Sequence, residues 1–138
     1  MREKRGLREA LAQRGACLDF DYLANDKATL FEAFVNRIES FAPTHVLTQF
    51  HGADQLTPEQ VARLKQKYPE TIWINWSGDS WLHSLTAPPM IDLAMQYDLW
   101  LVAAPDVLPV YEQYKINAHF WQIAAEWPML PLPEMPAY

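Results

Sequence analysis

Residues 57–76 read TPEQVARLKQKYPETIWINW and contain the signals of a helix followed by a strand. Thr57 offers an N-terminal cap, Pro58 suits the first helical position, and Gln60 completes a capping box. The apolar residues of the helix are spaced for one buried face: Val61, Leu64 and Tyr68. The segment 71–76 is short, β-branched and aromatic, which is typical of a buried strand.

Outward from this unit, strands and helices continue to alternate along the chain. The predicted strands are 16–23, 44–50, 71–76, 98–103 and 119–123. The predicted helices are 7–13, 27–41, 57–68, 88–97 and 105–114. Every connection between strands is long enough for a crossover helix, and none has a two-residue hairpin turn. We therefore expect an α/β fold, with an open, mostly parallel sheet and helices on both faces, as in Rossmann-like and flavodoxin-like domains.

The N-terminal part departs from this pattern. The helix 7–13 ends near Gly15, yet no strand precedes it, although a doubly wound sheet normally begins with a central strand. We therefore expect that the first central strand is missing, and that the chain is a fragment or has an altered strand order. Unpaired strand edges of this kind can recruit another chain, so a homo-oligomer is one expected consequence.

Composition restricts the possible functions. The 138 residues are 50% hydrophobic and 20% charged, which indicates one soluble domain, assigned to 1–127, and a proline-rich linker, 128–138. The single Cys17 cannot form an internal disulfide, which favours a reducing, cytoplasmic setting. No apolar run approaches the ~20 residues that a membrane span requires. The net charge of −6, with no Lys or Arg after Lys115, argues against nucleic-acid binding.

Several segments together resemble the N-terminal half of a GT-B fold glycosyltransferase, and in particular the CgeB-like (spore maturation protein-like) group. The resemblance extends over roughly residues 7–127 and is carried by four stretches of sequence. They are LREALAQRG at 7–15, FAPTHVLTQ at 41–49, IWINWSGD at 72–79 and YDLWLV at 97–102.

The resemblance implies an acceptor-binding domain of a nucleotide-sugar-dependent hexosyltransferase whose donor-binding C-terminal domain is absent. A single domain of this kind would be inactive in isolation. No cofactor is implied, because the nucleotide sugar is a substrate. The alternative is a non-catalytic flavodoxin-like binding or protein-interaction module.

Candidate catalytic residues follow the second and third predicted strands, whose carboxyl ends should share one edge of the sheet, where ligands bind. His51 suits a general base on an acceptor hydroxyl, because its ordinary pKa lies near 6.5. Asp79 suits either that base or the group that orients it. Each also has a structural explanation: His51 as a loop residue without a role, and Asp79 as a cap for nearby backbone amides.

The remaining candidates are substrate-binding residues in the same two loops: Gln49, Gly52, Gly78, Ser80 and Trp81. Trp81 offers an aromatic face for a sugar ring. Both glycines have the alternative explanation of a turn with positive φ. Within the third strand, Trp73 and Trp76 fall on opposite faces, so we expect at least one of them in the core.

No metal site is expected. The pair Asp79 and His83 has helical ligand spacing but no third ligand. The sequence Asp19-Phe20-Asp21 has the form of the metal-binding Asp-x-Asp motif of another glycosyltransferase fold. Alternation along the predicted strand 16–23 explains its two carboxylates without a metal.

Overall fold

The computed structural model describes residues 5–50, 52–78 and 82–121. The chain forms two units. The unit Phe20–Gln122 contains the sheet, and the other unit includes helix α1 (Arg5–Ala12), which corresponds to the predicted helix 7–13. The predicted linker 128–138 lies outside the described residues.

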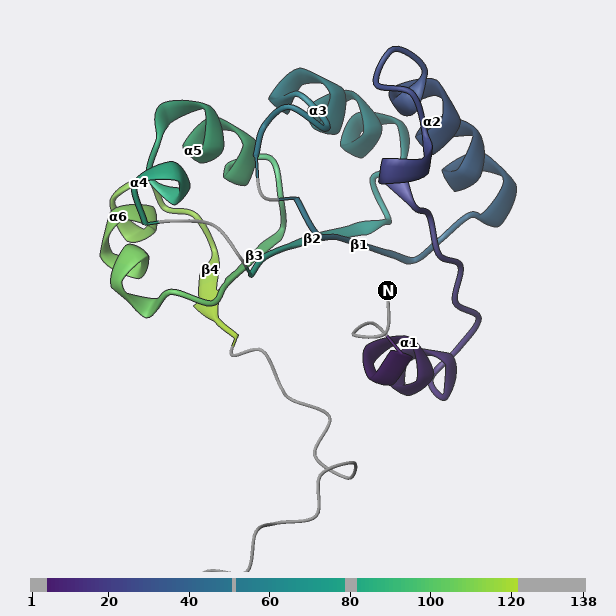
Figure 1. The fold of residues 1–138 in the computed structure, drawn as a ribbon, viewed down its shortest axis with the longest axis horizontal. Coiled ribbons are helices and arrows are strands. Elements are labelled where there is room, and N and C mark those ends of the chain that lie inside the picture. The colour runs from purple at the N-terminus through teal and green to yellow at the C-terminus, as the bar shows by residue number, and fades with distance from the viewer. Residues whose placement is uncertain (1–4, 51, 79–81, 122–138) are drawn as a thin grey trace, which may run out of the picture. The chain divides into compact units, whose positions relative to one another are not determined.

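A four-stranded sheet lies at the centre of the unit Phe20–Gln122 (Figure 1). Its strands are β1 (His45–Thr48), β2 (Ile72–Ser77), β3 (Leu99–Val102) and β4 (Ala118–Phe120). They lie in the order β1-β2-β3-β4, and each neighbouring pair is parallel. The predicted α/β fold with an open parallel sheet is therefore confirmed, and four of the five predicted strands are present.

Five α-helices of this unit are described, and Figure 1 shows them on one face of the sheet. They are α2 (Leu30–Phe41), α3 (Pro58–Lys67), α4 (Leu82–Leu85), α5 (Pro88–Ala94) and α6 (Leu108–Gln113). Crossovers between parallel strands are almost always right-handed, so strands that follow one another in order receive their helices on the same side. The opposite face is not covered by a described helix of this unit, which departs from the expectation of helices on both faces.

The strand order has no reversal. In a doubly wound sheet the order reverses beside the first strand, and the reversal opens a crevice between two crossovers that leave on opposite faces. Here β1 pairs directly with β2, with the register His45↔Ile72 to Thr48↔Asn75. Strands β1 and β4 form the two edges of the described sheet.

Helix α3 begins as its sequence predicts. The Thr57 side chain accepts a hydrogen bond from the Gln60 amide at 3.3 Å, and the Gln60 side chain accepts one from the Thr57 amide at 2.9 Å. This capping box satisfies two of the orphan N–H donors at the start of the helix. The other helices differ modestly from prediction: α2 begins at Leu30, α5 ends at Ala94, and the predicted 105–114 helix divides into η2 (Pro105–Val107) and α6.

The predicted strand 16–23 is wrong. The segment is irregular and ends in a single 3₁₀ turn, η1 (Tyr22–Ala24). The Asp21 side chain accepts a hydrogen bond from the Leu23 amide at 3.1 Å, and this local bond replaces a strand ladder. Asp21 is therefore a cap, not one of two carboxylates on the polar face of a strand.

Large aromatic side chains fill the helix-covered face of the sheet. Trp73 on β2 and Trp100 on β3 are fully buried, and so is Tyr111 on α6. The Tyr111 hydroxyl donates to the Leu85 carbonyl at 2.8 Å, and burial raises its pKa to about 12, so it keeps its proton at neutral pH. Trp76 lies half-buried on the other face of β2, which confirms that the two strand tryptophans point in opposite directions.

Asp98 joins the amino ends of β2 and β3. One carboxylate oxygen accepts the Trp73 amide at 2.8 Å, and the other lies 2.6 Å from the Lys65 ammonium. Burial raises the pKa of Asp98, but the hydrogen bond from Lys65, the Trp73 amide and the Lys65 charge outweigh it, and the pKa is lowered overall.

This lowered pKa predicts an acid-sensitive contribution to stability. Because the folded-state pKa lies below the unfolded value, the contribution is complete above pH ~4 and is lost as pH falls through the folded pKa. The pair is partly exposed and screened, so we expect that Asp98→Asn removes about 1 kcal/mol at pH 7 and much less at pH ~2. Urea unfolding at both pH values measures the difference. Asp92→Asn, on exposed α5 surface, is the control, and an equal effect of Asp98→Asn at both pH values would contradict the assignment.

Candidate functional site

The carboxyl ends of β1 and β2 lie at the same edge of the sheet, because the two strands are parallel and Thr48 is in register with Asn75. Gln49 and Gly52 follow β1, and Gly78 follows β2, so these three predicted site residues begin loops at one edge. Four other predicted site residues lie outside the described residues: His51, Asp79, Ser80 and Trp81.

A buried polar cluster lies beneath this edge. The Thr48 hydroxyl is 2.7 Å from Asn75 Oδ1 and 3.0 Å from the Tyr97 hydroxyl. A hydroxyl has one proton to donate. Thr48 donates this proton to Asn75 Oδ1, which is the shorter of the two contacts. The Tyr97 hydroxyl therefore donates its own proton to Thr48 Oγ1.

The same Asn75 side chain binds the main chain of Phe50. Asn75 Oδ1 accepts the Phe50 amide at 3.0 Å, and Asn75 Nδ2 donates to the Phe50 carbonyl at 3.4 Å. The Thr48 hydroxyl and the Phe50 amide both donate to one end of the Asn75 side chain, so that end must be the oxygen, Oδ1. The nitrogen, Nδ2, then faces the Phe50 carbonyl. Asn75 is fully buried and Tyr97 nearly so. Burial raises the pKa of Tyr97 well above its ordinary value, so the phenol keeps the proton that it donates to Thr48.

The segment before α2 packs against the loop that follows β1. The Tyr22 and Phe50 rings meet edge to face with centroids 5.5 Å apart, and Lys27 Nζ lies 2.7 Å from Asp54 Oδ2. The hydrogen bond from Lys27 is the main cause that holds the pKa of Asp54 below its usual value, against the opposing effect of burial. Burial, followed by the charges of Asp54 and Asp21, raises the pKa of Tyr22. Sequence analysis missed this group, because nothing local links Lys27 to Asp54.

Gly78 is required for a reason that differs from the predicted one. Neither Gly52 nor Gly78 has a positive φ, so the expectation of a left-handed turn at these glycines is wrong. A Cβ atom at position 78 would lie 2.6 Å from Cζ2 of the Trp76 indole. The missing side chain makes room for this close approach.

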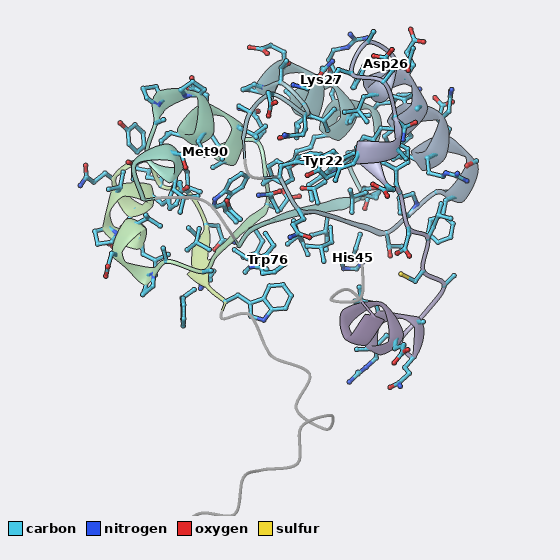
Figure 2. The ribbon with its side chains drawn as sticks, in the orientation of Figure 1. Tyr22, Asp26, Lys27, His45, Trp76 and Met90 are labelled. Carbon is cyan, nitrogen blue, oxygen red and sulfur yellow. The ribbon has the colours of Figure 1, made fainter. Side chains whose placement is uncertain are left out.

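The sheet face opposite the helices is partly apolar and open. Figure 2 shows Trp76 and His45 on this side of the sheet, away from Tyr22 and Lys27. Leu47 is 38% exposed and Ile72 is 44% exposed on the same face. The Trp76 ring also contacts the Trp121 ring, with centroids 5.6 Å apart.

Over residues 5–50, 52–78 and 82–121, no three His, Cys, Asp or Glu side chains are grouped closely enough to hold a metal ion. None of the helices in the same ranges combines the length and apolar character needed to cross a bilayer. Asp79, one of the two residues of the Asp79 and His83 pair, lies outside these ranges.

Comparison of the chain with protein-family models, with curated proteins and with solved structures gave no match.

Proposed function

We propose that this chain is the acceptor-binding domain of a nucleotide-sugar-dependent glycosyltransferase, a transferase that works with a separate donor-binding domain. One observation carries the proposal: β1 and β2 are parallel neighbours, so the loops that contain His51 and Asp79 start from the same edge of the sheet. Ligands of open α/β domains bind at this edge. The proposal includes a cytoplasmic location, which the single Cys17 favours.

In the proposed reaction, an acceptor hydroxyl attacks the anomeric carbon of the donor sugar, and the nucleotide leaves. His51 or Asp79 accepts the proton of that hydroxyl, and Trp81 stacks on a sugar ring. Gln49, Gly52, Gly78 and Ser80 supply main-chain and side-chain contacts to the acceptor. No resident cofactor takes part in this scheme.

The strand order favours a second candidate function. Because β1-β2-β3-β4 has no reversal, the described sheet lacks the crevice that doubly wound enzymes use. A non-catalytic module that binds another protein needs no such crevice. The open sheet face with Leu47 and Ile72 supports this candidate.

Calorimetry separates the two candidates. The complete natural gene product that contains residues 1–138 is titrated with UDP-glucose, UDP-N-acetylglucosamine and GDP-mannose. The transferase proposal predicts saturable heat with at least one donor, and donor consumption when an acceptor is added. Residues 1–138 alone are the matched control and are expected to be catalytically silent. No heat with any donor would favour the interaction module.

A further inference from the structure

Asn75 is an unusual residue for its position. It is a fully buried amide in a strand whose other residues are mostly apolar, and it lies level with the last residue of β1. A buried amide lowers stability unless its polar atoms are paired. Its side chain bonds to Thr48 and to both main-chain groups of Phe50, so these bonds are directed at the point where β1 ends.

The pattern of these bonds resembles strand pairing. The Asn75 side chain accepts from the Phe50 amide and donates to the Phe50 carbonyl, as a neighbouring strand would do through its main chain. Phe50 is thereby held after the β1 ladder has ended, and its ring is buried against Tyr22. The direction of the chain leaving β1 is set at this residue.

We propose that Asn75 is a positioning residue that sets the start of the loop following β1. The importance of this role for activity rests on the proposed function, because the same loop begins at the sheet edge that is proposed to bind the acceptor. The structural role itself does not depend on that proposal. The Thr48 hydroxyl donates a further hydrogen bond to Asn75 Oδ1 and is bonded in turn to the Tyr97 hydroxyl, while the two bonds to Phe50 are made by Asn75 alone. A residue that only fills the core would act on the whole fold equally, whereas a positioning residue acts first on Phe50.

Amide hydrogen exchange of residues 1–138, followed by NMR without any nucleotide sugar, tests the inference. The Phe50 amide reports the loop, and the Trp100 amide, bonded to the Asn117 carbonyl at 2.9 Å, reports the sheet. Asn75→Leu removes the acceptor of the Phe50 amide at similar volume. A hydrogen bond worth about 1 kcal/mol predicts that protection at Phe50 falls roughly fivefold relative to Trp100. The nuclear Overhauser contact between the Tyr22 and Phe50 rings should weaken with it.

Asn75→Asp provides the rescue. When protonated, the acid still accepts the Phe50 amide and can donate to the Phe50 carbonyl, as the native amide does. When ionised, it is a buried charge that opposes that carbonyl. Relative protection at Phe50 is therefore expected to be near native at pH ~5 and reduced at pH ~8, because burial raises a carboxyl pKa.

Thr48→Val is the matched control, because it alters the same cluster and leaves the two Phe50 bonds in place. It should lower protection at Phe50 and Trp100 by the same factor. The inference is overturned if Asn75→Leu also lowers both amides equally, or if Asn75→Asp shows no pH dependence at Phe50. Neither result bears on sugar transfer, so failure here is distinct from failure of the calorimetric test.

Discussion

Replacement of Trp100 by alanine is expected to lower the free energy of unfolding by about 3–5 kcal/mol. Trp100 is 0% exposed, and its ring centroid lies 5.3 Å from that of Tyr97 and 6.4 Å from that of Tyr111. The truncation removes this packing and leaves a cavity between the sheet and α6. Because small domains are stable by about 5–15 kcal/mol, such a loss removes a large fraction of the free energy of unfolding.

Urea unfolding at neutral pH measures the change. Trp121→Ala is the matched control, since Trp121 is 36% exposed and its ring packs against the half-buried Trp76. That variant should lose about 1 kcal/mol. A loss below about 1 kcal/mol for Trp100→Ala would show that the helix-covered face is not the core of the domain.

In the proposed transferase, His51→Ala and Asp79→Asn are each expected to lower turnover by ~10²-fold or more, because each removes a group proposed for proton transfer. If His51 is the base, turnover of the parent enzyme rises with pH through the range near 6.5, and His51→Ala loses that rise. Initial-rate kinetics with saturating donor and acceptor separate this effect from weaker binding.

His45→Ala is the control for these two variants. His45 is the first residue of β1, so it lies at the amino end of the strand, and the loop after Thr48 leaves from the carboxyl end. It should retain full turnover. Unchanged rates in both His51→Ala and Asp79→Asn would remove both catalytic assignments and leave the acceptor-binding role without a base from this domain.

The parallel sheet was predictable because its signals are local. The capping box at Thr57 and the apolar run ending at Trp76 define one helix and one strand, and the spacing of the other runs excludes hairpins. The strand predicted for 16–23 was wrong because it depended on a local signal alone. Its alternation matches a strand, but the Asp21 side chain bonds the Leu23 amide and forms a turn.

The contacts at the sheet edge were less predictable because they join distant residues. Tyr97 reaches Thr48 across 49 positions in the sequence, and Lys27 reaches Asp54 across 27. One signal was available: Asn75 is a polar residue inside an apolar strand, and such residues are usually paired when buried. The Gly78 contact with the Trp76 indole depends on a rotamer, which sequence patterns do not specify.

Each strand of the described sheet pairs with the strand that comes directly before or after it in the chain. The domain is thus assembled like a short row of repeats, in which each strand-helix unit depends chiefly on its immediate neighbours. Such a row loses structure from its ends. Of the two end strands, β4 is the less stabilised, because it has only three residues and its Phe120 is exposed. Local opening should therefore begin at β4, ahead of the other end strand β1, and reach the central strands β2 and β3 last.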